Sequence, residues 1–342
     1  MKHISIKDVA RELGVAVSTV SRAFNDKYDI KKETRAKILK KAKEMGYHPN
    51  PIAMKLQQNR TLNIGVVVPE FRNAFFPDVI CGIQDVLIPR GYQVLIMQSN
   101  EESERELANV KTLVNSMVDG IIISFSTNTE DTSYYKELER KNFPIVQFNR
   151  VLDKLKTSKV VFDDYTWAFF ATEHLIHQGY KNIVHLAGPK NFSFSRLRKK
   201  GFIDALKKHN LHFGDEKIIP AGITIEDGKH AMQELINSQN IPEAIFAIND
   251  PAAIGAMLVL KENKIKIPDD IGIVGFSESR FSDVIEPSLT TVQQPTYEMG
   301  QTAANVILQE IESNIKIPQT LTLGGSFKLK KSSVRIASLY KK

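Results

Sequence analysis

The sequence predicts a small all-α headpiece of the helix-turn-helix type, followed by an α/β core of two doubly wound parallel-sheet lobes. Three observations support this fold class. The first 25 residues carry the apolar spacing of two short packed helices. From residue 62 onward, apolar strand-like runs alternate with helical runs, and the excess positive charge lies near the N-terminus. A chain of 342 residues is long enough for two or three domains.

The stretch from Ile6 to Asn25 has the pattern of a helix-turn-helix. Gly14 stands where the turn between the helices needs a positive φ. The second helix, from Val17 to Asn25, enters the major groove of DNA in such motifs. An ordinary αα-hairpin is the alternative interpretation. The apolar residues expected between the helices are Val9, Ala10, Leu13, Val15, Val20 and Ala23, and the second helix is expected to expose Val17, Ser18, Thr19, Ser21 and Arg22.

A third helix is expected over residues 31–45, with Gly46 as its stop. Its apolar stripe is Ile38, Leu39, Ala42 and Met45, and the basic side chains expected to be available for phosphates are Lys31, Lys32, Arg35, Lys37, Lys40, Lys41 and Lys43. Residues 52–58 are long enough for two helical turns, which are marginal in water without a surface to dock on. We therefore expect a headpiece over 1–48, a hinge over 49–60 that folds only on DNA, and a core over 61–342. An inert tether is the alternative for the hinge.

The charge is distributed unevenly along the chain. Residues 1–60 hold 14 Lys and Arg against 6 Asp and Glu, whereas the other 282 residues hold 32 against 33. The formal net charge of +7 therefore belongs to the headpiece and hinge. This asymmetry indicates a polyanion as the partner of that segment alone.

The core is predicted to contain two successive series of strands and helices, which implies two parallel sheets with helices on both faces. The expected helices span 78–89, 101–117, 131–141, 165–178, 197–208, 225–238 and 251–262. Ligands of such sheets bind beyond the carboxyl ends of the strands. Those ends carry Asn73, Phe75, Phe76, Asn149, Asp163, Asn249 and Ser277. Two lobes with these ends facing each other form a cleft for a small polar molecule.

Catalytic motifs are missing from the sequence, which has no GxGxxG, no P-loop lysine motif, no GxSxG and no HExxH. We expect no enzyme activity, no catalytic residue and no cofactor. His174 and His177 lie three residues apart on one predicted helix, but no third ligand is in view, so we expect a structural or surface role and no metal site. Cys81, the only cysteine, is expected to be a small buried residue.

The N-terminal residues have no apolar h-region, and no apolar run reaches membrane-spanning length. The sequence therefore predicts a cytoplasmic protein without a membrane partner.

Nine blocks of the sequence, in order, resemble the LacI/GalR-type repressors, the relatives of the lactose and galactose repressors. The blocks are IKDVARELGVAVSTVSRAFN, GYHPNPIAMKL, IGVVVPEFRNAFFPDVICGI, VDGIIIS, HLIHQGYKNIVHLAG, RLRKKGF, AINDPAAIGAM, IPDDIGIVGF and PSLTTVQQP. The resemblance implies a cytoplasmic, homodimeric or higher-order transcription regulator with a core like periplasmic sugar-binding proteins. It implies an N-terminal lobe of about 62–162 plus 292–322, and a C-terminal lobe of about 163–290 plus 323–342.

The resemblance also implies which residues contact DNA. Val17, Ser18 and Arg22 match base-reading positions, and Thr19, Ser21 and Asn25 match positions near the backbone. Leu56 matches a hinge leucine that wedges into the minor groove and kinks the duplex. Ala53 and Lys55 flank it, and Ser5 completes the expected set. Met54 replaces a common hinge arginine, and Lys31 replaces a serine that caps the third helix.

Arg198 lies where the family has its effector-binding arginine. The resemblance implies that the other effector-binding residues are Asn73, Phe75, Phe76, Asn149, Asp163, Ile223, Asn249, Ser277 and Gln294. A guanidinium and carboxamides suit a hydroxyl- or carboxylate-bearing ligand. Ser277 replaces an aspartate that grips sugar hydroxyls in many relatives, and Ile223 replaces a stacking aromatic. Phe192 and Phe194 are expected to pack or to supply apolar surface, with packing favoured.

The expected function is that of a repressor that binds a near-palindromic DNA operator and is controlled by a small, sugar-like effector in the interlobe cleft. The alternatives are a sugar-binding transport protein without DNA function, an enzyme on the same fold, and an activator or corepressor-dependent regulator of the same family. A phosphoprotein in place of the small ligand belongs to the last alternative. Both inducer and corepressor behaviour are compatible with the residues.

Overall fold

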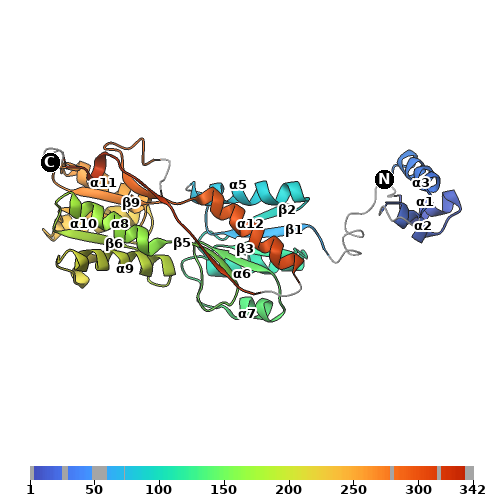
Figure 1. Ribbon diagram of the computed structural model, residues 1–342, viewed down its shortest axis with the longest axis horizontal. Coiled ribbons are helices and arrows are strands. Elements are labelled where there is room, and N and C mark those ends of the chain that lie inside the picture. Colours follow the sequence, from blue (N-terminus) through green and yellow to red (C-terminus); the bar gives the residue numbers. More distant parts are fainter. Residues whose placement is uncertain are drawn as a thin grey trace. The chain divides into compact units, whose positions relative to one another are not determined.

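The computed structural model describes residues 4–24, 30–47, 60–72, 74–277, 281–313 and 317–335. The chain divides into two compact units, Met1–Leu62 and Asn63–Lys342. The first unit is the helical headpiece, and the second is the α/β core (Figure 1).

Three helices form the headpiece: α1 (Ile6–Leu13), α2 (Val17–Phe24) and α3 (Lys32–Glu44). Their shared core consists of Val9, Ala10, Val20, Ala23, Ile38 and Ala42. Gly14 has a φ of 65° and ends α1, as the sequence predicted. The short α1–α2 connection follows from this glycine, because a left-handed residue costs little there.

Two basic residues of α3 are engaged within the headpiece. The Nε of Arg35 donates to the Ala23 carbonyl at 3.0 Å, and the Nζ of Lys41 lies 2.9 Å from Glu12 Oε1. Each of these two side chains thus also links α3 to a neighbouring helix, and their availability for phosphates stays a prediction. The exposed lysines of this segment are Lys31, Lys32, Lys37, Lys40 and Lys43.

The first lobe of the core contains a fully parallel sheet in the order β11-β5-β4-β3-β1-β2. Its strands are β1 (Asn63–Val68), β2 (Gln93–Gln98), β3 (Gly120–Ile123), β4 (Ile145–Phe148), β5 (Ser158–Phe162) and β11 (Thr320–Leu323). The helices around it are α5 (Phe75–Leu87), α6 (Ser103–Asn115), α7 (Ser133–Arg140) and α12 (Thr296–Glu312), with the short η1 (Ile88–Arg90). Strands β1, β3 and β4 are almost completely buried, as helices on both faces of a sheet require.

The second lobe contains a sheet in the order β12-β10-β9-β8-β6-β7, in which only β12 is antiparallel to its neighbour. Its strands are β6 (Ile183–Ala187), β7 (Ile218–Pro220), β8 (Ala244–Ala247), β9 (Gly272–Phe276), β10 (Thr290–Gln293) and β12 (Ser326–Lys328). The helices are α8 (Asp164–His177), α9 (Ser193–Lys208), α10 (Ile225–Asn237) and α11 (Asp250–Glu262), with η2 (Asp215–Lys217) and η3 (Lys331–Ser333).

The chain passes between the two lobes at three places, after β5, after β10 and after β11. These crossings lie side by side between the lobes in Figure 1. Short parallel connections of this kind can bend without breaking either sheet. They are therefore the natural positions for lobe movement.

Three sequence predictions need correction. Helix α5 begins at Phe75 rather than at residue 78, and α9 begins at Ser193 rather than at residue 197. Neither N-cap residue, Ala74 or Phe192, makes a side-chain cap bond, so the usual start signal is missing. Cys81 is exposed, because α5 turns Val79, Ile80 and Ile83 toward the core and Cys81 away from it.

Candidate ligand cleft and DNA-binding face

A cavity of about 160 Å³ lies between the two lobes of the core. Both lobes and the β10–α12 crossing contribute to its wall. The lining residues are Ala74, Phe75, Phe76, Asp78, Asn149, Arg150, Phe194, Arg198, Ile223, Asn249, Pro251, Ser277, Gln293, Gln294 and Thr296. Amides, hydroxyls and guanidinium groups alternate with aromatic and aliphatic surface. This mixture suits a small polar molecule with apolar faces.

The strand ends shape this wall through their backbone conformation. Asn149 directly follows β4 with a φ of 56°, and Ser277 directly follows β9 with a φ of 101°. Residues other than glycine rarely adopt such angles, and they persist where the surrounding structure enforces them. The two turns bring an amide and a hydroxyl to the cavity, one from each lobe.

Arg198 is held by a buried ion pair. Its Nε donates to Asp164 Oδ1 at 2.8 Å, its Nη2 lies 2.7 Å from the same oxygen, and its Nη1 donates to the Ile248 carbonyl. Its guanidinium carbon is 3.6 Å from the centre of the Phe276 ring. Burial raises the pKa of the Asp164 carboxyl, and the charge of Arg198 opposes that rise by stabilising the carboxylate. The guanidinium therefore reaches the cavity with its charge already compensated.

The second arginine of the wall, Arg150, is compensated in the same way. Its Nη1 lies 2.6 Å from Glu101 Oε1, and its guanidinium carbon lies 5.5 Å from the centre of the Phe76 ring. The other oxygen of Glu101 accepts a hydrogen bond from the Thr127 backbone at 3.0 Å. Glu101 thus ties Arg150 to the loop after β3.

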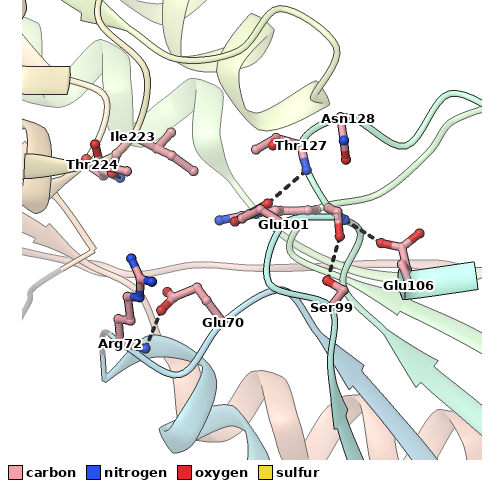
Figure 2. A network of polar contacts seen from close by, with 12 residues as sticks. Glu70, Arg72, Ser99, Glu101, Glu106, Thr127, Asn128, Ile223 and Thr224 are labelled. Atoms are coloured by element: carbon pink, nitrogen blue, oxygen red, sulfur yellow. Dashed lines mark hydrogen bonds and ion pairs between the residues drawn. The ribbon is translucent and has the colours of Figure 1, made fainter. Parts of the chain in front are cut away.

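Figure 2 shows the polar network that Glu101 belongs to. Ser99 Oγ lies 2.7 Å from Ser126 Oγ, and the Ser126 backbone donates to Glu106 Oε2 at 2.6 Å. Burial raises the pKa of Glu106, whereas its hydrogen bonds lower it. Figure 2 also shows Ile223, which lines the cavity from the second lobe, with its side chain directed toward this network. The network ties the loop after β2 to the loop after β3.

Gln294 presents an unsatisfied donor in the cleft. Its side chain is only 4% exposed and lines the cavity, yet its Nε2 has no hydrogen-bond partner among the described residues. A buried amide without a partner costs free energy. A ligand with an acceptor oxygen at this place would remove that cost.

Most of the residues predicted for the effector lie together in this wall, namely Phe75, Phe76, Asn149, Arg198, Ile223, Asn249, Ser277 and Gln294. Asp163 does not line the cavity; it caps α8, accepting from the Thr166 backbone at 3.1 Å. Asn73 lies outside the described residues. Phe192 is fully buried and stacks on Phe194, which lines the cavity. Phe192 therefore packs in the core, whereas Phe194 supplies apolar surface to the cavity.

Six wall residues were not predicted as ligand contacts, namely the apolar Ala74 and Pro251 and the polar or charged Asp78, Arg150, Gln293 and Thr296. Arg150 and Gln293 each adjoin a residue that was predicted, and their position next to a strand end is the signal that could have found them. Asp78 and Thr296 lie in the first turns of α5 and α12. Thr296 follows the crossing after β10, and the sequence pattern does not reveal that crossing.

The candidate DNA-binding face of the headpiece is the outer side of α2. Val17, Ser18 and Arg22 are exposed, and Thr19 and Ser21 are partly exposed. Ser5 precedes α1 and its backbone N–H donates to Asp8 Oδ2 at 2.9 Å. Asn25, Ala53, Lys55 and Leu56 lie outside the described residues, as does almost all of the predicted hinge.

Comparison with known protein families assigns this chain to a family. Residues 5–50 match the family described as "Bacterial regulatory proteins, lacI family", and residues 61–331 match "Periplasmic binding proteins and sugar binding domain of LacI family". The chain belongs to the LacI family. The fold class predicted from the sequence is thereby confirmed.

Individual LacI-family proteins support the assignment over nearly the full length. The chain is 32% identical over 308 residues to the HTH-type transcriptional repressor CytR of Escherichia coli, covering 90% of each. A structure of the lac repressor dimer bound to operator and the anti-inducer ONPF has a TM-score of 0.82 and 25% identity, covering 98% of this chain and 100% of that one. A transcriptional regulator CelR–cellobiose complex has a TM-score of 0.73 and 26% identity, with 96% and 99% covered. Among the described residues, no helix is long and apolar enough to cross a bilayer.

Proposed function

We propose that this LacI-family protein is a dimeric transcriptional repressor whose affinity for a DNA operator is set by a neutral, sugar-like ligand in the cleft. The observation that carries the proposal is the interlobe cavity, in which the buried Gln294 Nε2 has no partner in the part of the chain that the structure describes, within a domain of the sugar-binding family type. The CelR–cellobiose complex is a related structure that holds a sugar.

The charges in the cleft favour a neutral ligand over an anionic one. Arg198 and Arg150 are each paired with a carboxylate at 2.6–2.7 Å, so neither presents an uncompensated positive charge. Both still have N–H groups to offer to hydroxyl oxygens. The amides of Asn149, Gln293 and Gln294 supply both donors and acceptors.

The apolar part of the wall fits the same class of ligand. Phe75, Phe194 and Ile223 offer carbon surface on which the C–H face of a sugar ring packs. A pyranose or furanose presents hydroxyls at its rim and C–H groups on its faces. We therefore infer a free sugar or nucleoside-like sugar rather than a sugar acid or sugar phosphate.

The headpiece supplies the DNA affinity in this proposal. Its exposed lysines attract phosphates without regard to sequence, and the exposed face of α2 reads base edges in the major groove. Two headpieces of a dimer read two half-sites, so the operator is a near-palindrome. The lac repressor dimer on its operator is the related example.

The ligand controls DNA affinity by binding one arrangement of the lobes better than the other. The three crossings between the lobes let the arrangement change while both sheets stay intact. A coupling free energy of about 1–3 kcal/mol would change operator affinity roughly five- to 150-fold.

A two-part experiment tests this function. A thermal-shift screen of neutral sugars, sugar acids, sugar phosphates and nucleosides on the full chain should give stabilisation by a neutral sugar-like compound. Fluorescence anisotropy on inverted-repeat duplexes should then show that the same compound changes the operator affinity. Stabilisation by anionic sugars alone would contradict the neutral class, and a compound that binds without changing DNA affinity would contradict the control of repression.

A further inference from the structure

Three metal-ligating side chains meet on the second lobe, away from the cleft. Glu173 and His177 lie four residues apart on α8, and His209 directly follows α9. One ligand atom from each lies within 4.8 Å of the other two. We propose that these residues bind a divalent transition-metal ion of the Zn²⁺ or Ni²⁺ class and thereby join the ends of α8 and α9.

The packing of α8 on α9 explains how the three side chains come together. The helices run parallel, because Asp164 contacts Arg198 near their beginnings and Glu173 contacts His209 at their ends. They approach closely at Gly201, where a Cβ atom would collide with the backbone of Tyr165 and Phe169. Residues at i and i+4 share one helix face, so Glu173 and His177 both point toward the end of α9.

The ligand set suits a borderline cation. Imidazole nitrogens and a carboxylate oxygen bind Zn²⁺ and Ni²⁺ well, with bonds of about 2.0–2.2 Å to zinc. Two histidines with one glutamate leave one coordination position for water or another ligand. Glu173 Oε1 and His209 Nε2 are already 2.6 Å apart, and the rings of His177 and His209 have centres 5.3 Å apart. A small movement of the three side chains completes the site.

Glu173 already attracts a cationic side chain in this structure. Lys208 Nζ lies 3.0 Å from Glu173 Oε1 and competes with a bound metal for it. Its side chain is 59% exposed and can turn into solvent.

The neighbouring His174 does not belong to the site. Its Nε2 lies 2.8 Å from Ser333 Oγ, and its ring packs on Phe327. The sequence pairs His174 with His177 and offers no third ligand. The structure instead separates the two histidines and supplies Glu173 and His209, one from the same helix and one from α9.

Calorimetric titration of the tag-free, full-length protein with Zn²⁺ and with Ni²⁺ tests the proposal. The wild type should bind one ion per chain with micromolar or tighter affinity. His177→Gln and Glu173→Gln should each weaken binding at least tenfold, whereas Lys208→Gln should strengthen it several-fold by removing the competing charge. His177 is exposed, so its substitution leaves the fold intact.

His230→Gln is the matched control. His230 Nε2 lies 3.3 Å from Glu234 Oε1 in an i, i+4 pair like that of Glu173 and His177, but this pair is in no three-ligand group among the described residues. Its substitution should leave the affinity unchanged. Co²⁺ should give visible d–d bands without a thiolate charge-transfer band, which separates this site from Cys81. Hydrogen exchange should slow at the ends of α8 and α9 when metal is bound.

The proposal is overturned if the wild type binds no ion at 100-fold excess over ~1 μM protein, which corresponds to a dissociation constant above the range of a built site. It is also overturned if His177→Gln binds as tightly as the wild type, or if the bound Co²⁺ shows thiolate absorption.

Discussion

The Nη2 of Arg198 lies 2.7 Å from Oδ1 of Asp164, and both side chains are almost completely buried beside the cleft. This pair joins α9 to α8 and orients the guanidinium toward the cavity. Arg198 therefore has two roles, one in the stability of the second lobe and one in the proposed ligand site. Experiments on it must separate the two.

Substitution of Arg198 by Ala is expected to lower the free energy of unfolding by about 3–5 kcal/mol, because Asp164 stays buried without its partner. The double variant Arg198→Met with Asp164→Leu should lose less than Arg198→Ala. Urea unfolding of the variants and the wild type measures these differences. A double variant that loses as much unfolding free energy as Arg198→Ala, or more, would show that the pair is not coupled.

Substitution of Gln294 by Leu should affect ligand binding and stability in opposite directions. The apo protein should be as stable as the wild type or more stable, since a buried amide with an unpartnered nitrogen is removed. The affinity for the neutral ligand should fall about tenfold or more, which is roughly 1.4 kcal/mol. Calorimetric titration and urea unfolding provide the two readouts. Unchanged ligand affinity would remove Gln294 from the site.

Arg22→Ala and Lys37→Ala should weaken DNA binding differently. Arg22 is exposed on α2, and its loss should cost about 1–3 kcal/mol of discrimination between operator and random DNA. Lys37 is exposed on α3, and its loss should weaken binding to operator and to random DNA equally and reduce the salt dependence of the affinity. Anisotropy titrations at several salt concentrations distinguish these outcomes. Equal losses on both DNAs for Arg22→Ala would contradict base reading.

Acid should destabilise the second lobe through His185. Burial lowers the pKa of His185 to about 4, and its Nδ1 lies 2.9 Å from the Phe246 carbonyl oxygen. His185 binds a proton near pH 6.5 in the unfolded chain but only near pH 4 in the folded protein. The stability is therefore complete above pH 6.5 and falls by about 3 kcal/mol as the pH drops to about 4.

The variant His185→Gln tests this assignment. Its unfolding free energy should depend less steeply on pH between 6.5 and 4. The slope should correspond to nearly one proton fewer taken up on unfolding than in the wild type. Urea unfolding at a series of pH values gives the slope. A variant with the wild-type slope would assign the acid sensitivity to other groups, of which His174 is the first, since burial lowers its pKa to about 4 as well.

The parts of the fold with strong local signals could be predicted from the sequence. Gly14 and the buried residues Val20 and Ala23 identify the two helices of the headpiece, because the turn and the apolar face are both local features. The buried strands β1, β3 and β9 appear as continuous apolar runs for the same reason.

The partners of individual side chains could not be predicted. Arg198 and Asp164 are 34 residues apart, and Arg150 and Glu101 are 49 apart, so no local pattern pairs them. Without those pairs, the sequence leaves both carboxylate-bearing and hydroxyl-bearing ligands open. His209 joins His177 only through the packing of α8 on α9, which depends on a close approach at Gly201.

Ligand binding in the cleft should be coupled to operator binding in one molecule, and a single set of titrations measures this coupling. The full-length protein is titrated onto a labelled inverted-repeat duplex, selected from a random pool, and onto a scrambled duplex, each with and without the sugar found by thermal shift. We expect at least a 1,000-fold preference for the selected duplex, of the order known for specific DNA binding. We further expect a change of roughly five- to 150-fold in that affinity alone when the sugar is added. Equal affinity for both duplexes, or an operator affinity that stays the same when the sugar is added, would contradict this coupling.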